Sequence, residues 1–168
     1  MDGSGFPQCL STLRFHEMAQ EGTFSEKELR AVATDRKVAG EYAALRQCDA
    51  AFKEMIDADQ EMQRQLQQQQ SKKRDHSHGH QGEAAAGDGG AEGMAANEVK
   101  YVGYVDCVSS ALCPASLKEW YSCLEQAKAG ERPVESCEVV KHMLERCLRA
   151  ETDALFRASQ AHVFRPTQ

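Results

Sequence analysis

The chain has few aromatic residues, no long apolar run and no excess of basic residues. Aromatic side chains make up 7% of its 168 residues, charged side chains make up 27%, and the mean hydropathy is −0.60. A large buried core is therefore not expected, and elongated helices held by cross-links or partners suit the composition better. No apolar run approaches the roughly 20 residues needed to cross a bilayer. We expect a protein that reaches a membrane through its partners and does not span it.

The charge balance and the absent motifs argue against further classes of protein. The net charge is −6, whereas nucleic-acid binders usually present a basic face, so no nucleic-acid partner is expected. Residues 1–20 contain one Arg, one Asp and one Glu, unlike an Arg-rich transit peptide or an apolar secretory signal. The sequence contains no G-x-S-x-G, no phosphate-binding loop and no H-E-x-x-H. We expect neither catalysis nor a cofactor.

A long amphipathic helix is predicted over residues 23–70, after an N-terminal extension of residues 1–22. Ser25 and Glu28 form a capping box at its start, and the stretch that follows contains no proline and one glycine, Gly40. Apolar residues then recur at a/d spacing, which predicts a face that packs on another helix, either the chain's own hairpin or a neighbouring subunit. We name this set the partner-helix stripe: Leu45, Phe52, Met55, Met62 and Leu66.

Residues 71–98 are predicted to form a flexible, low-complexity linker, because they contain almost no bulky apolar side chain. His76, His78 and His80 lie within it, and we expect them to be solvated and not to bind a metal. The apolar, β-prone run 99–105 that follows is either a docking strand or an extended lead-in, and we favour the lead-in.

The cysteines carry the strongest signal in the sequence. Nine residues separate Cys113 from Cys123, and nine separate Cys137 from Cys147. Both segments show helical periodicity. The first begins with Pro114 and a capping box formed by Ser116 and Glu119, and Ser136 is placed to cap the second. Gly130 and Pro133 break the chain between them.

The spacing itself predicts two disulfides. Ten helical positions advance the chain by about 15 Å and bring the second cysteine back to roughly the same face. If the two helices fold antiparallel, Cys113 meets Cys147 at one end and Cys123 meets Cys137 beside the loop. Each bridge could contribute on the order of 2–4 kcal/mol. A shared zinc ion is not expected, because thiolates about 15 Å apart cannot both ligate one ion.

The stretch from Cys113 to Cys147 resembles the coiled-coil-helix–coiled-coil-helix (CHCH, twin CX9C) family. The resemblance implies residence in the mitochondrial intermembrane space, peripheral to the inner membrane, and the same disulfide connectivity. It also implies import by an oxidoreductase relay that oxidises these cysteines. Family members carry aromatic or aliphatic residues beside a docking cysteine, and Trp120, Tyr121 and Leu124 flank Cys123 in that way. Trp120 also suits a simple packing role in the seam of the hairpin.

Three cysteines lie outside this pattern, and their pairing stays open. Seven is an odd number, so at least one thiol is unbridged or pairs with another chain. Cys48 lies on the heptad stripe, where a small apolar residue fits. Cys107 could bridge either to Cys9 or to Cys48.

The expected fold class is all-α: a disulfide-stapled antiparallel helical hairpin within residues 99–168, the long N-terminal helix and the linker. The expected function is that of a structural subunit of a large inner-membrane assembly, a respiratory complex or the ATP synthase. Its partners would be the protein subunits of that assembly and, during biogenesis, the import oxidoreductase. The alternatives are an assembly factor, a copper carrier and a mitoribosomal protein. The last two fit less well, because the chain has no Cys-Cys pair and its charge is acidic.

Overall fold

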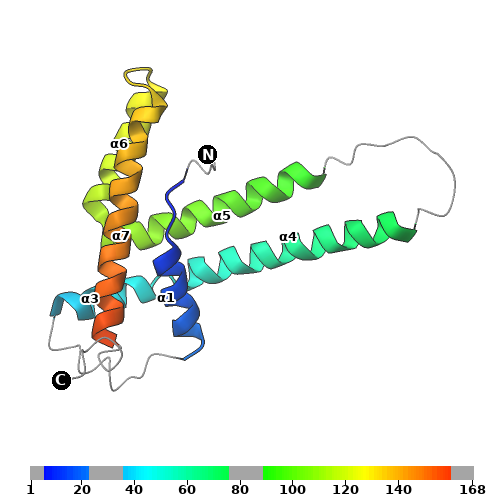
Figure 1. Ribbon diagram of the computed structural model, residues 1–168, viewed down its shortest axis with the longest axis horizontal. Coiled ribbons are helices and arrows are strands. Elements are labelled where there is room, and N and C mark those ends of the chain that lie inside the picture. The colour runs from blue at the N-terminus through cyan, green and yellow to red at the C-terminus, as the bar shows by residue number, and fades with distance from the viewer. Residues whose placement is uncertain (1–5, 23–35, 76–88, 160–168) are drawn as a thin grey trace. The chain divides into compact units, whose positions relative to one another are not determined.

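The computed structural model describes residues 6–22, 36–75 and 89–159, and this part of the chain is helical with no strand (Figure 1). The predicted all-α class is confirmed. None of the described helices is long and apolar enough to cross a membrane. The helices are α1 (Leu10–Gln20), α3 (Arg36–Arg46), α4 (Asp49–Asp75), α5 (Gly89–Leu112), α6 (Pro114–Lys128) and α7 (Glu138–Ser159), with a short 3₁₀ helix η2 (Val134–Cys137) before α7.

The chain forms two compact units, whose boundaries fall inside α4 and α5. Residues 1–49 and 105–168 make the first unit, and residues 50–104 make the second. Helix α7 is the central element of the first unit, because α1, α3 and α6 all pack against it. Its residues Leu144, Leu148 and Leu155 are buried. They recur at helical spacing and so form one apolar face.

Aromatic side chains fill one end of the first unit. Phe15 of α1 meets Tyr42 of α3 edge-on, with ring centroids 5.6 Å apart, and lies 6.2 Å from Phe156 of α7. Such contacts add to the stability that burial alone provides. Helix α1 is therefore a packed part of the fold, although the sequence indicated only an N-terminal extension for residues 1–22.

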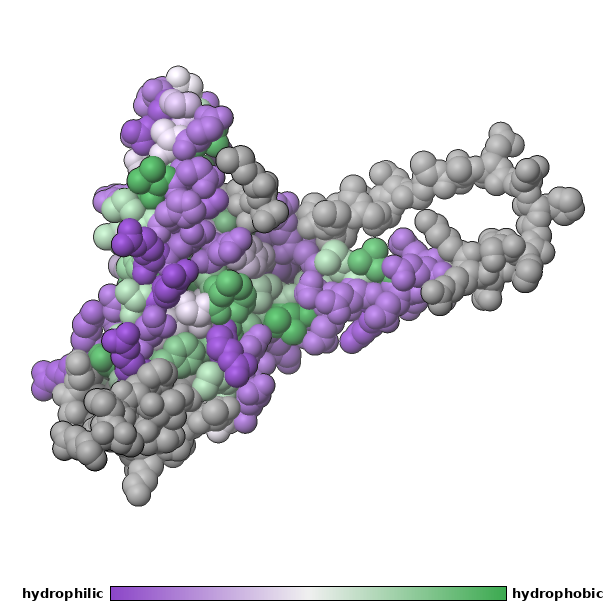
Figure 2. All heavy atoms as spheres, in the orientation of Figure 1, coloured by the Kyte–Doolittle hydropathy of each residue, from purple (hydrophilic) through white to green (hydrophobic). Residues whose placement is uncertain are grey.

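The second unit is an antiparallel pair made of α4 and the first part of α5. Phe52 lies 5.7 Å from the ring of Tyr104, and Glu54 is ion-paired with Lys100. Further along, Met62 accepts a hydrogen bond from Asn97, at 3.4 Å. These pairs run in opposite directions along the two helices, as an antiparallel hairpin requires. The surface seen in Figure 2 is mostly hydrophilic, with apolar residues in separate spots.

The predicted helix over residues 23–70 is divided in the structure. Its expected start at Ser25 lies outside the described residues. The described part is interrupted at Gln47–Cys48, where the backbone N–H groups bond three residues back, to Ala44 and Leu45. A new helix begins at Asp49, whose carboxylate lies in the first turn, near the positive end of the helix dipole.

The predicted linker is partly helical, so its boundaries were wrong. Helix α4 continues to Asp75 and α5 begins at Gly89, while residues 76–88, with the three histidines, lie outside the described part. Residues 91–98 contain three alanines, two glutamates and one methionine, which are good helix formers, beside one glycine and one asparagine. The extended lead-in over residues 99–105 was also wrong. It lies within α5, because tertiary packing overrides a weak β propensity.

Candidate functional site

The candidate site is the hairpin of α6 and α7, which two disulfides hold closed. Cys113 is bonded to Cys147 with their Cα atoms 6.2 Å apart, and Cys123 to Cys137 at 5.7 Å. Both distances lie in the ordinary range for disulfides. The spacing of the cysteines predicted both pairs. The two bridges fix the hairpin at its tip and about three helical turns away from it, so its helices cannot slide or part.

The ends of these helices differ in detail from the prediction. Cys113 itself is the N-cap of α6 and Pro114 is the first helical residue, without any side-chain cap. The predicted capping box of Ser116 and Glu119 therefore does not start the helix. Ser136 lies in η2, where its hydroxyl donates 2.7 Å to the carbonyl of Pro133. Because η2 has Pro133 as its N-cap and Ser136 lies inside η2, Ser136 is not the predicted N-cap.

The loop between the two helices is set by Gly130. After the C-cap Ala129, Gly130 has φ +74°, a conformation that glycine adopts without steric cost. The N–H of Glu131 then bonds to the carbonyl of Gln126, and that of Gly130 to Ala127. This is the Schellman arrangement, which satisfies the last carbonyls of the helix. It turns the chain sharply enough for Cys137 to reach Cys123.

The predicted import-docking residues divide between the inside and the surface of the hairpin. Trp120 is 5% exposed and Cys123 is 2% exposed, so both belong to the seam between the helices. Leu124 is half-buried. Tyr121 points outward and donates a hydrogen bond to Asp106 of α5. Partial burial, the hydrogen bond and the negative charge of Asp106 together raise the pKa of Tyr121 to about 12, so the phenol stays protonated.

A third disulfide, Cys48–Cys107, joins the turn between α3 and α4 to α5. The two Cα atoms are 5.8 Å apart, and the residues are separated by 59 positions. The sequence left Cys107 with two possible partners, and the structure selects Cys48. Cys9 takes part in none of the three bridges and is buried at the N-cap of α1. Only the fold brings Cys48 to Cys107, because no repeat spacing relates them.

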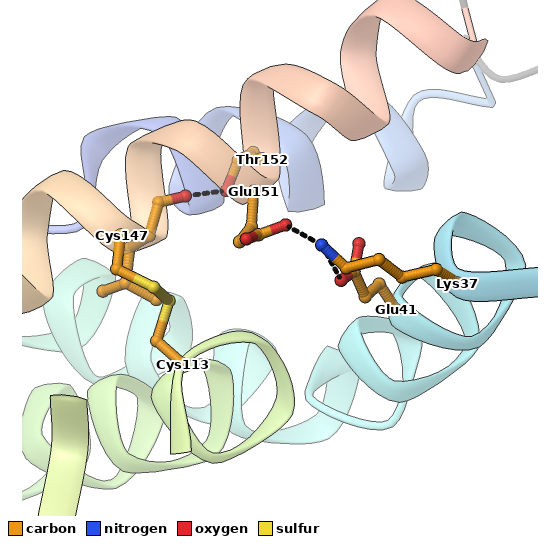
Figure 3. The surroundings of a disulfide bond; sticks show 7 residues. Lys37, Glu41, Cys113, Cys147, Glu151 and Thr152 are labelled. Carbon is orange, nitrogen blue, oxygen red and sulfur yellow. Dashed lines mark hydrogen bonds and ion pairs between the residues drawn. A yellow bond between two sulfur atoms is a disulfide. The ribbon is translucent and has the colours of Figure 1, made fainter. Parts of the chain in front are cut away.

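Polar contacts between α3 and α7 lie in the surroundings of the Cys113–Cys147 bridge (Figure 3). The ammonium of Lys37 lies 3.3 Å from Glu41 and 3.2 Å from Glu151 of α7. The hydrogen bonds to Glu151 and Glu41, with the charges of both carboxylates, raise the pKa of Lys37. One turn beyond Cys147, the hydroxyl of Thr152 donates 2.6 Å to the carbonyl of Leu148. Helix α7 is thus joined to the start of α6 by the disulfide and to α3 by the Lys37–Glu151 ion pair.

A buried histidine anchors α1 to the start of α4. His16 Nδ1 lies 3.0 Å from a carboxylate oxygen of Asp49, and the other oxygen lies 2.7 Å from Arg46. Desolvation lowers the pKa of His16, and the nearby Asp49 opposes that shift only in part. The imidazole is therefore neutral near pH 7 and donates Nδ1–H to the carboxylate. Nothing in the local sequence pattern marks His16 as a residue with a buried partner.

The partner-helix stripe proves to be mostly internal. Leu45, Phe52 and Met55 are 0%, 2% and 9% exposed, so these three cannot provide a surface for another subunit. Met62 is half-buried, and only Leu66, at 49%, is substantially exposed. The periodicity correctly indicated a face that packs on another helix. For Phe52, the helix on which it packs is α5 of the same chain.

Comparison of the chain with protein-family models, with curated protein sequences and with solved structures found no significant match.

Proposed function

We propose that this chain is a non-catalytic structural subunit of a large energy-transducing complex of the mitochondrial inner membrane, on the side of the intermembrane space. The observation that carries the proposal is the helical hairpin closed by Cys113–Cys147 and Cys123–Cys137. Nine residues separate Cys113 from Cys123, and nine separate Cys137 from Cys147. That arrangement resembles the CHCH family, whose members are oxidised in this compartment. Disulfides persist in oxidising compartments and are rare where glutathione keeps thiols reduced.

The distribution of buried residues supports a scaffold. Three disulfides hold a chain that is 7% aromatic, and each described α-helix buries apolar side chains within the fold. A cross-linked chain keeps its shape without a large core. Such a rigid chain suits a clamp between neighbouring subunits.

Protease protection tests the location. In intact mitochondria the protein should resist added protease, and it should become sensitive once the outer membrane alone is opened. Protection that persists after opening would place the protein in the matrix and contradict the proposal. Cys123→Ser should lower mitochondrial accumulation, because the docking cysteine and a bridge are lost together. Cys9→Ser, outside the bridges, is the matched control and should leave accumulation near wild type.

Native-gel co-migration tests the role. The protein should co-migrate in stoichiometric amount with one mature inner-membrane complex, as mass spectrometry of the excised band can measure. Its absence from every mature complex would contradict a structural subunit.

An assembly factor is the second candidate, and the burial of Leu45, Phe52 and Met55 favours it. With these residues packed internally, the stripe is no longer an argument for a permanent interface. An assembly factor should appear only with incomplete subcomplexes and should leave when the complex matures. Pulse-labelled native gels distinguish the two roles, because a structural subunit persists through the chase.

A further inference from the structure

The outward face of α7 combines apolar, small and arginine residues along one line. Val139 and Met143, on the first turns, are 66% and 51% exposed. From Met143 the same face continues at intervals of three, four and seven residues, through Arg146, Ala150 and Arg157. All three are exposed. At about 100° per residue these positions share one side of the helix, opposite the buried leucines. The face is thus unlike the mixed polar side of an ordinary surface helix.

The second half of this face is a shallow groove, which we call the α7 arginine groove. It is lined by three alanines and four charged residues of α7, namely Ala150, Ala154, Ala158, Arg146, Arg149, Asp153 and Arg157. Three arginines and one aspartate leave a local charge of +2 on a chain whose net charge is −6. Among the residues that the structure describes, none forms an ion pair or hydrogen bond with the side chain of any of these arginines. The guanidinium groups are therefore available to a partner.

The geometry points to an acidic amphipathic helix of a neighbouring subunit as the occupant of the α7 arginine groove. Alanines at every fourth position let a second helix approach closely, at the short end of the usual interaxial range. Arginines beside such a row can form bidentate bonds with Asp or Glu of the approaching helix. Val139 and Met143 extend the contact and offer apolar surface to the same partner. The inference rests on the proposed function, for which it supplies the docking surface and the chemistry of the partner.

An anionic membrane surface fits the groove less well. Interfacial helices insert an apolar face that usually carries bulky or aromatic residues, with basic residues on the polar side. In α7 the apolar face that holds Leu144, Leu148 and Leu155 is already buried in the fold. Among the described residues, the groove is lined with alanine and carries no aromatic side chain. Small side chains beside arginine suit a second helix and give little insertion into lipid.

Site-specific cross-linking in mitochondria tests the inference on the full chain. A photo-reactive residue replaces Ala150 in the groove, and the adducts are identified by mass spectrometry. We expect a cross-linked peptide that carries Asp or Glu at helical spacing next to small or apolar residues. The triple variant Arg146→Glu, Arg149→Glu, Arg157→Glu should lower the yield about tenfold or more, since three attractive pairs become repulsive. All three positions are exposed, so the variant should keep its three disulfides and its helix content.

A matched control carries the same change of charge on other faces. Lys53→Glu, Lys118→Glu, Lys128→Glu also alters three exposed cations, and it should leave the cross-link near the wild-type yield. A cross-link to lipid, to a basic segment, or at equal yield in both triple variants overturns the inference. If the wild-type chain co-migrates with a complex and the arginine variant does so equally, the groove is refuted while the proposed function stands. If the wild-type chain co-migrates with none, the proposed function fails and the identity of the adduct alone decides on the groove.

Discussion

Removal of the Cys48–Cys107 bridge should destabilise the protein more than removal of either CX9C bridge. Its cysteines are 59 residues apart, against 34 and 14 for the other two. In the chain-entropy model a closed loop of that size stabilises by about 4 kcal/mol, whereas the 14-residue loop gives about 3 kcal/mol. The Cys123–Cys137 loop is also nested within the Cys113–Cys147 loop, so removing the Cys123–Cys137 bridge releases less of the unfolded chain. The 59-residue loop encloses no other bridge and contains all of residues 50–104.

The assay is denaturant unfolding of Cys48→Ala/Cys107→Ala beside Cys123→Ala/Cys137→Ala, without reductant. A loss of about 4 kcal/mol in the free energy of unfolding is a large fraction of the total stability of a small domain. Cys9→Ala is the control for the loss of a buried sulfur, because Cys9 is buried and lies outside the bridges. A loss below about 1 kcal/mol for Cys48→Ala/Cys107→Ala, or a larger loss for Cys123→Ala/Cys137→Ala, would refute the loop-entropy argument.

Three further predictions concern single residues. Because burial lowers the pKa of His16, the unfolded chain binds more protons below its ordinary pKa of about 6.5, so stability should fall as the pH drops from 7 toward 5. His16→Gln should flatten that dependence in pH-resolved thermal melts, and an unchanged slope would exclude His16 as its source. Gly130→Ala should cost about 1–2 kcal/mol because φ is +74°, whereas Gly103→Ala, in a helix with open space around it, should be neutral or stabilise by up to about 1 kcal/mol. Equal effects in chemical unfolding would contradict the assigned turn. Phe52→Glu should destabilise the isolated chain by several kcal/mol because Phe52 is 2% exposed, and Leu66→Glu, at 49%, should change it little. A larger destabilisation by Leu66→Glu than by Phe52→Glu in chemical unfolding would contradict the internal packing of Phe52.

The cysteine spacing was enough to predict the hairpin because a helix converts sequence distance into direction. Ten positions return a side chain to nearly the same face, so one antiparallel partner with the same spacing determines both pairs. The position of the loop could also be predicted, because Gly130 and Pro133 each restrict or free the backbone at their own positions. Helix caps were predicted less well. Ser116 and Ser136 both suit a cap, but α6 begins at Pro114 with Cys113 as its N-cap, and α7 begins after a 3₁₀ turn.

The periodicity of the stripe predicted that Phe52 packs on a helix, but not on which one. Tyr104 of α5 packs against Phe52, whereas an apolar helix of another chain would have offered the same chemistry. Likewise, the alanine-rich tract before residue 99 has the composition of a linker and the propensity of a helix. Its state depends on whether α4 is there to pack against, which a local pattern does not contain.

The sequence by itself therefore determined the helical class, the two CX9C bridges and the loop between them, because these depend on spacing within one hairpin. Only the tertiary structure decided that Cys48 bonds to Cys107, that His16 meets Asp49, and that α7 turns its arginines outward. Each of these depends on which helices lie side by side. That choice is made by the packing of the whole chain, because the free energy of burying one face depends on every other face that could cover it.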